Sequence, residues 1–214
     1  MIDFLQSTVE WSNWGMNALT ISALGTFVLT VVQTRSFAKQ ARAIWNSGKG
    51  DSVSVTMFGY LQFYLMSFVF YGIAMKSIAM MANGLLFICI IPILFGLCKY
   101  KKLTLLEKCS VVAFSVLPVA MAVTPHKQQL FFCMLAGLLV ALACPAYEIW
   151  RNKDAGVFEV QVAIATMCTN IFWGAYAFMT WDVPLMIFNP LSCALMVVTI
   201  CLWMRYKRSP VCVV

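Results

Sequence analysis

Residues 170–189 read NIFWGAYAFMTWDVPLMIFN, and this stretch decides the fold. It holds the end of one apolar helix with a late Tyr176, a tight turn at Asp182, and the start of a second apolar helix with an early Asn189. A buried amide or carboxyl group in lipid is costly unless it has a partner. The stretch therefore predicts two membrane helices with polar groups held between them.

The whole chain has the composition of an integral membrane protein. Of its 214 residues, 62% are hydrophobic and 11% are charged, and the mean hydropathy is +0.86. Soluble domains have roughly 45 to 50% apolar and about 25% charged residues, so the excess apolar surface requires lipid. A helix needs about 20 apolar residues to cross the bilayer, so the chain holds about seven spans and no sizeable soluble domain.

Hydropathy and loop signals predict an all-α membrane protein with seven transmembrane helices. The predicted helices cover residues 20–43, 53–75, 77–98, 104–123, 128–149, 157–180 and 183–204. The preceding residues 1–19 contain Asp3 and Glu10 but no basic residue, so they lack the positively charged start of a signal peptide. We interpret them as an outer amphipathic lead-in.

The net charge of +7 reflects membrane topology and not binding of nucleic acid. In the seven-helix scheme only Lys76 and Lys127 fall on one side. The other basic residues fall on the opposite side or in the adjoining helix ends: Arg35, Lys39, Arg42, Lys49, Lys99, Lys101, Lys102, Lys108, Arg151, Lys153, Arg205, Lys207 and Arg208. The positive-inside rule then predicts a cytosolic C-terminus and an outer or lumenal N-terminus. The choice between plasma membrane and internal membrane stays open.

The chain contains an internal repeat. A shift of 105 residues superimposes Ala41, Ile44, Trp45 and Tyr71 on Ala146, Ile149, Trp150 and Tyr176, and with one inserted residue Asn83 meets Asn189. An extra span between the repeats gives both the same orientation, as in parallel repeats. We expect a 3+1+3 arrangement: residues 1–98 form a three-helix bundle with the lead-in, 99–126 a linker helix, and 127–214 a second bundle with a cytosolic tail.

This layout resembles the SWEET sugar transporters and the wider PQ-loop (MtN3-saliva) family over nearly the whole chain. In that family the second repeat carries Asn, Trp and Tyr at three-residue spacing, an acidic residue in the outer turn and Asn in the last helix. Here these positions hold Asn170, Trp173, Tyr176, Asp182 and Asn189. The first repeat is looser, with Phe68 in place of Trp, then Tyr71 and Asn83, and the PQ dipeptide is eroded to Lys39-Gln40 and Cys144-Pro145.

The paired asparagines and the resemblance predict a substrate site at mid-membrane. Amides donate and accept hydrogen bonds, which suits sugar hydroxyls, and aromatic faces stack on sugar rings. The predicted substrate-binding residues are Asn83, Asn189, Trp173, Phe68 and Asn170. Helix–helix hydrogen bonds and ordinary packing are the alternative roles. The resemblance further implies gates: Tyr71, Tyr176 and Asp182 at the outer mouth, Gln40 and Pro145 near the inner one.

Arg35, Lys39 and Arg42 share one helix face. They either attract an anionic substrate, with Arg35 as the candidate contact, or extend to lipid phosphates. The nine cysteines show no CxxC, so we expect no metal, cofactor or disulfide framework, and most are predicted to be small buried residues. The acidic residues fall near loops or helix ends and no catalytic motif occurs, so an enzyme is not expected.

The preferred function is facilitated diffusion of a small polar solute, with a sugar favoured, by alternating access in a lipid bilayer. One alternative is a PQ-loop-type transporter of an organic anion or amino acid. Another is a membrane receptor of the same architecture that transports nothing. The sequence also leaves open whether one chain suffices or a homo-oligomer forms.

Overall fold

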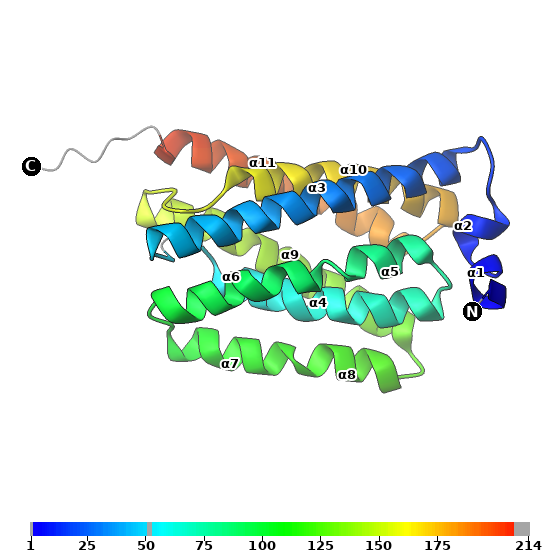
Figure 1. Cartoon of the computed structure of the whole chain (residues 1–214), viewed down its shortest axis with the longest axis horizontal. Helices are drawn as coiled ribbons and strands as arrows, with labels where there is room; N and C mark the ends of the chain where they lie inside the picture. Colours follow the sequence, from blue (N-terminus) through cyan, green and yellow to red (C-terminus); the bar gives the residue numbers. More distant parts are fainter. Residues whose placement is uncertain (1, 51–52, 208–214) are drawn as a thin grey trace, which may run out of the picture.

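The computed structural model describes residues 2–50 and 53–207, and all secondary structure in these ranges is helical (Figure 1). Arg208, one of the basic residues counted above, lies outside the described residues. The helices in chain order are α1 (Ile2–Gln6), α2 (Val9–Ser12), α3 (Ala18–Ser47), α4 (Val55–Ala74), α5 (Ile78–Gly84), α6 (Phe87–Tyr100), α7 (Leu105–Phe114), α8 (Val116–Val123), α9 (Lys127–Asn152), α10 (Val160–Thr180) and α11 (Val183–Lys207).

Seven segments of the described chain are helical, long enough and apolar enough to cross a membrane: α3, α4, α5 with α6, α7 with α8, α9, α10 and α11. The predicted all-α class with seven membrane helices is thereby confirmed, and each predicted boundary lies within four residues of the observed one. The largest difference is the end of α3, which continues to Ser47. Gly48 then ends it in the left-handed conformation at φ +63°, which glycine adopts without a Cβ clash.

Two of the seven predicted helices are interrupted. Leu85 and Leu86 separate α5 from α6, directly after the Asn83-Gly84 pair, and Ser115 separates α7 from α8. Asn and Gly are weak helix formers, and Asn83 Oδ1 instead accepts a hydrogen bond from Thr30 Oγ1 at 3.2 Å. The first break therefore begins two residues after Asn83, whose side-chain amide contacts α3.

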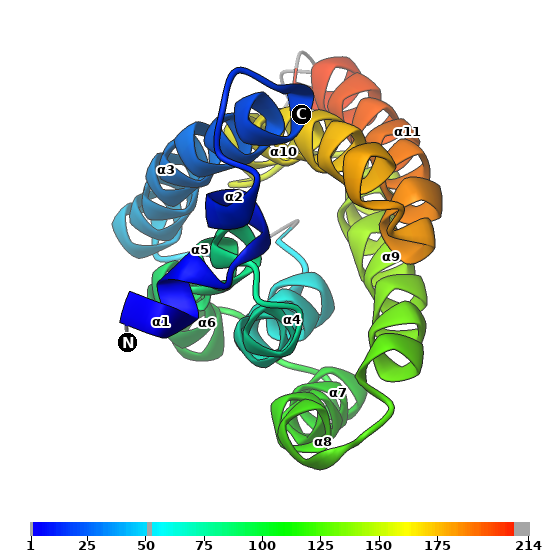
Figure 2. The ribbon, with the colours of Figure 1, turned by 90° about the vertical axis from the view of Figure 1, so that its right-hand side faces the viewer.

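The helices that contain the repeats contact one another in matching ways. The third segment, α5 with α6, packs against both α3 and α4, and α11 packs against both α9 and α10. Across the two sets, α3 packs on α10 and α4 on α9. The end-on view in Figure 2 shows these helices arranged around a common centre, with α7 and α8 outside the ring. The α7–α8 segment packs mainly on α4.

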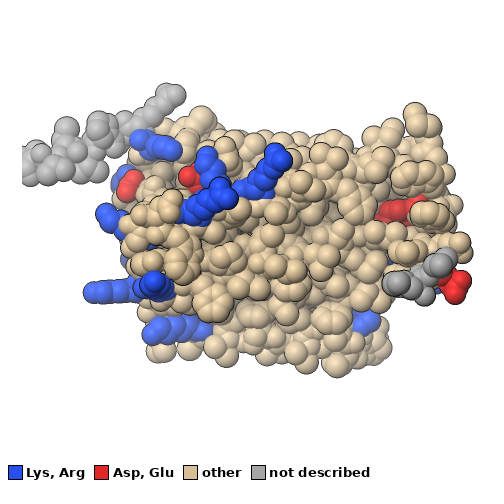
Figure 3. Space-filling view, in the orientation of Figure 1, with Lys and Arg blue, Asp and Glu red and all other residues tan. Residues whose placement is uncertain are grey.

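The two ends of the molecule differ in charge. Figure 3 shows most of the Lys and Arg surface at the end where α11 finishes, and Figure 1 shows the N-terminal helices α1 and α2 at the other end. We call these the basic end and the lead-in end. Because the described helices run nearly parallel to the long axis, a polar side chain in the middle of a helix lies far from both ends.

Gly84 sets how closely α5 approaches α4. A Cβ at this position would lie 2.9 Å from Val69 N and 3.0 Å from Leu65 O, which are backbone atoms that cannot turn away. We expect Gly84→Ala to lower the free energy of unfolding by about 1–3 kcal/mol through overpacking. Gly174→Ala is the matched control, because its nearest neighbour, Asn189 Cβ, is 3.6 Å away. Thermal unfolding in detergent checks both, and equal stabilities would contradict the prediction.

Candidate functional site

A central cavity of about 60 Å³ lies between the membrane helices. Its lining comes from six of the seven membrane-length segments, and α7–α8 contributes none of the described lining residues. The structure brings together here all the residues predicted to bind the substrate: Asn83, Asn189, Trp173, Phe68 and Asn170. No Asp, Glu, Lys, Arg or His occurs among the described residues that line it. The cavity is therefore electrically neutral and combines amides with aromatic and aliphatic side chains.

Each of the three asparagines is held by one end of its amide. Asn83 Oδ1 accepts from Thr30, Asn170 Nδ2 donates to Ser192 Oγ at 2.6 Å, and Asn189 Nδ2 donates to Leu185 O at 2.7 Å. The opposite amide atoms, Asn83 Nδ2, Asn170 Oδ1 and Asn189 Oδ1, make no hydrogen bond to any described residue. The three amides thus leave one nitrogen and two oxygens without a hydrogen-bond partner, on side chains that are held at the other amide atom.

An aromatic wall faces these amides. Phe68 on α4 meets Trp173 on α10 edge to face, with ring centroids 5.5 Å apart. Phe68 also stacks on Phe131 of α9 at 5.6 Å, and Phe131 stacks on Tyr71 at 4.0 Å. Such contacts are favourable beyond the burial of area alone. The wall therefore joins α4 to α9 and to α10, and it places the predicted pair Phe68 and Trp173 against each other.

At the lead-in end a buried carboxylate joins three parts of the chain. Glu10 on α2 is 5% exposed. Its carboxylate accepts hydrogen bonds from Ser77 Oγ at 2.5 Å, from the Ile78 and Ala79 N–H groups at 3.0 and 3.1 Å, and from Tyr176 OH at 3.2 Å. Figure 2 shows α2 in front of α5, across the end of the ring. Glu10 therefore links the lead-in, the start of α5 and α10; we call Glu10, Ser77 and Tyr176 the Glu10 cluster.

A second cavity, of about 100 Å³, lies beside this cluster. Asp182, one of its lining residues, is 7% exposed and accepts a hydrogen bond from Leu185 N–H at 3.2 Å. Burial raises the pKa of the Asp182 carboxyl above its ordinary value, and the Leu185 hydrogen bond opposes part of that effect. Tyr71 is fully buried, and its hydroxyl has no hydrogen-bond partner among the described residues, Asp182 included.

At the basic end, Gln40 joins α3 to the connection between α9 and α10. Its side chain is fully buried. Nε2 donates to Val157 O at 3.1 Å, and Oε1 accepts from Glu159 N–H at 2.8 Å, so the amide pairs with the α9–α10 connection as a neighbouring strand would. Lys39 Nζ adds an ion pair to Glu159 at 3.2 Å. Pro145, the second residue assigned to this gate, is buried inside α9.

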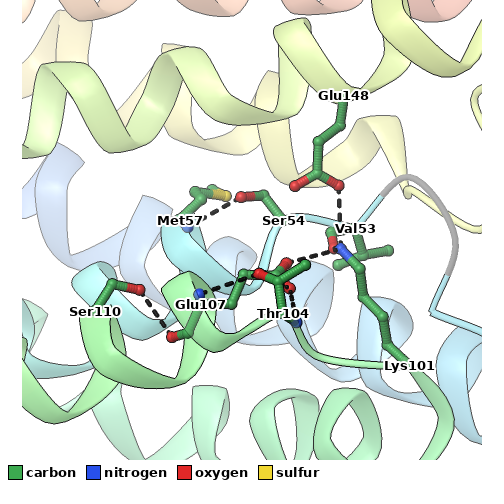
Figure 4. A network of polar contacts seen from close by, with 8 residues as sticks. All are labelled: Val53, Ser54, Met57, Lys101, Thr104, Glu107, Ser110 and Glu148. Atoms are coloured by element: carbon green, nitrogen blue, oxygen red, sulfur yellow. Dashed lines mark hydrogen bonds and ion pairs between the residues drawn. The ribbon is translucent and has the colours of Figure 1, made fainter.

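A separate polar network at the basic end centres on Lys101 (Figure 4). Lys101 Nζ donates to Val53 O at 2.8 Å and lies 3.3 Å from the carboxylates of both Glu107 and Glu148. Glu107 completes a capping box with Thr104 at the start of α7. These contacts join the start of α4, the connection before α7 and the end of α9, so we interpret this network as structural.

The basic stripe on α3 does not enter the central cavity. Arg35, Lys39 and Arg42 are exposed, and none of them lines the cavity. Their side chains lie on the exposed surface of α3, and Lys39 is paired there with Glu159. Arg35 is therefore not in contact with the neutral lining described above.

One expectation about the cysteines is wrong. The eight described cysteines are all partly or fully exposed, so they are not small buried residues. Four of them, Cys98, Cys109, Cys133 and Cys201, are exposed on helix surfaces, and the other four are half-buried. Among the described residues, no group of three or more His, Cys, Asp and Glu side chains could hold a metal ion.

The sequence analysis missed two polar residues that the structure places at important points. Gln33 on α3 lines the central cavity, and Glu10 holds the lead-in. The repeat comparison could not reveal Gln33, because its counterpart is Leu138. A signal did exist for both: an amide in the middle of an apolar helix, and an acid ahead of the first membrane helix, are each costly to bury without partners.

Residues 129–210 match the family model described as "Sugar efflux transporter for intercellular exchange". The match spans α9, α10 and α11 and includes Asn170, Trp173, Tyr176, Asp182 and Asn189, so the suspected similarity to the SWEET and MtN3 family is confirmed for this part of the chain. The match and the seven apolar helices indicate a multi-pass membrane protein of a transporter type, which is not an enzyme class. No curated protein and no solved structure matches the chain.

Proposed function

We propose that this protein carries a small neutral polar solute, a sugar, across a membrane by facilitated diffusion with alternating access. The observation that supports this best is the central cavity, which offers unpaired amide donors and acceptors beside an aromatic wall and has no charge among its described lining residues. Hydroxyl groups both donate and accept, and the apolar face of a sugar ring packs on aromatic rings. The family match over the second repeat supports the same solute class.

The proposed orientation puts the basic end in the cytosol and the lead-in end outside. The positive-inside rule supports this assignment, since of the 15 Lys and Arg residues only Lys76 and Lys127 belong to the lead-in end. Under this orientation the Glu10 cluster and Asp182 belong to the outer mouth. The contact of Gln40 with the α9–α10 connection belongs to the inner one.

The proposed moving parts are two bundles: α3, α4 and α5–α6 with the lead-in (residues 1–98), and α9, α10 and α11 (residues 127–214). The α7–α8 segment within residues 99–126 is the linker. Polar contacts join the bundles near both ends, and the hydrogen bonds Gln33–Thr166 and Tyr60–Met134 join them between the ends. The Glu10–Tyr176 hydrogen bond ties the outer ends, and the Gln40 and Lys39 contacts tie the inner ends. Breaking one set while keeping the other exposes the cavity to one side, as alternating access requires.

Uptake into liposomes that contain the purified protein tests the proposal. The panel holds D-glucose, sucrose, gluconate and lysine, each with and without a pH gradient. We expect uptake of a neutral sugar, indifferent to the pH gradient and unchanged by Arg35→Gln. Uptake of gluconate or lysine alone, lost in Arg35→Gln, would instead establish a transporter of charged solutes. Binding of a panel member without flux would establish a receptor.

A further inference from the structure

Among the described residues that line the central cavity, Gln33 is the one with a buried side-chain polar atom that has no hydrogen-bond partner. It is 7% exposed, and its Oε1 has no hydrogen-bond partner among the described residues. Its Nε2 makes one long contact, 3.4 Å to Thr166 Oγ1 on α10. Exchanging the two amide atoms would leave the nitrogen unpaired instead, so one end of the amide is free in either orientation.

A buried amide with an unpaired atom is unusual, and the position of Gln33 beside the central cavity suggests a reason for it. Most buried polar atoms in proteins have a partner, and an unpaired one is a candidate for a ligand contact. Gln62 on α4 has the same unpaired Oε1 and a similar burial, but it does not line the cavity. Gln33 is therefore distinguished by lining the cavity that the three asparagines also line.

Gln33 adds to an inequality of the two repeats that Asn170, paired with Leu65, also creates. The repeat shift of 105 residues pairs it with Leu138, which lines the cavity from α9 and is buried. The asparagines Asn83 and Asn189, by contrast, are matched between the repeats. A solute bound by the matched pair alone could lie in two opposite orientations, whereas an amide on the α3 side only selects one of them.

We propose that Gln33 is a specificity-determining residue, whose carboxamide accepts a hydrogen bond from one hydroxyl of a neutral polyhydroxylated solute and fixes its orientation. This inference rests on the function proposed above and names which side of the solute is recognised. With no charged group among the described lining residues, nothing compensates a carboxylate or ammonium at this place. The inference therefore selects polyols and sugars over organic anions and amino acids.

Gln33→Leu, which copies the repeat counterpart, tests the proposal by two measurements with opposite expected outcomes. The binding constants for D-glucose and sucrose are measured by titration calorimetry on the purified protein, and thermal unfolding is measured without sugar. We expect the better-binding sugar to lose about tenfold or more in affinity, since about 1.4 kcal/mol corresponds to tenfold. The melting temperature should stay the same or rise, because the unpaired amide is gone.

Gln62→Leu is the matched control: it should also keep or raise the melting temperature, with unchanged affinity. Monodeoxy analogues of the same sugar identify the recognised hydroxyl. The analogue that lacks it should lose affinity in the wild type but lose nothing more in Gln33→Leu. A lower melting temperature of Gln33→Leu with unchanged affinity would assign Gln33 to helix packing and overturn the inference.

The inference and the proposed function fail in different ways. If neither sugar binds the wild type, the proposed function fails and the inference with it. If sugar binds the wild type and Gln33→Leu within twofold of each other, the inference fails alone. Gln33→Asn keeps the amide on a shorter stem and separates the two roles if Gln33→Leu does not fold: reduced affinity at wild-type stability supports recognition, and wild-type affinity contradicts it.

Discussion

Sugar uptake is expected to fall at least about 100-fold when Asn83 and Asn189 are both replaced by alanine, and about tenfold for each replacement alone. Both residues line the cavity from opposite repeats, and each presents an unpaired amide atom to it. Removing that atom leaves a solute hydroxyl desolvated without a partner, which costs about 1–3 kcal/mol per lost bond. Initial rates of uptake into liposomes, normalised to inserted protein, give the measurement.

The control for this pair is Asn46→Ala, because Asn46 is exposed near the end of α3. Each cavity asparagine also has a structural bond, Asn83 to Thr30 and Asn189 to Leu185. Thermal unfolding of every variant therefore accompanies the transport assay. A folded double variant that transports within twofold of the wild-type rate would refute the substrate role of both residues.

The outer mouth is expected to open about tenfold more often when Glu10 is replaced by alanine. The change removes the acceptor of four hydrogen bonds, and a hydrogen bond to a charged group contributes about 1.5–3 kcal/mol. Only the bond from Tyr176 crosses between the proposed bundles; the others hold the lead-in on the start of α5. The reporter is Met80→Cys, because Met80 is buried and lines the cavity at the lead-in end. Its rate of reaction with a membrane-impermeant thiol reagent added from outside measures the opening.

Three control measurements are needed to interpret the reaction rate. Protein without Met80→Cys supplies the background from the native cysteines. Asp3→Asn removes the other acidic charge of the lead-in, on an exposed side chain, and should leave the reaction rate unchanged. Tyr176→Phe removes both hydrogen bonds of the Tyr176 hydroxyl, to Glu10 and to Ser77, and should raise the rate while the Ile78 and Ala79 amides stay protected from hydrogen exchange. If Glu10→Ala frees those amides but the thiol reacts at the wild-type rate, the cluster anchors the lead-in without closing the mouth.

The second repeat was the most predictable part of the chain. Its five marked residues, Asn170, Trp173, Tyr176, Asp182 and Asn189, lie within the region that matches the family model, and three of them line the central cavity. Spacing carries this information because residues on one face of a helix recur at fixed intervals. The repeat then directed attention to Asn83 and Phe68, which the structure brings to the same cavity. Their roles in transport stay predictions that the experiments above address.

Residues without a repeat partner or a motif could not be placed in this way. Nothing in the local sequence of Gln33 says whether its side chain faces lipid, a neighbouring helix or a cavity, because that depends on how α3 is rotated against α10. Arg35, two residues later and so about 200° further round the helix, lies on the exposed surface of α3, so turning α3 by about half a turn would exchange the environments of the two side chains. The partner of Asn83 is similarly a tertiary result, since Thr30 on α3 supplies it.

The sequence by itself determined that the chain is a membrane protein, that it has seven membrane-length helical segments and roughly where each begins and ends. It could do so because the free energy of transferring a helix into lipid is a sum over about 20 residues, so it depends little on any one of them. The tertiary structure alone decided that α3 packs on α10, that Gln33 faces the cavity while Arg35 faces outward, and that Glu10 reaches Ser77 and Tyr176. These contacts join residues up to 166 positions apart, and they depend on helix rotation and side-chain fit, which hydropathy and spacing do not specify.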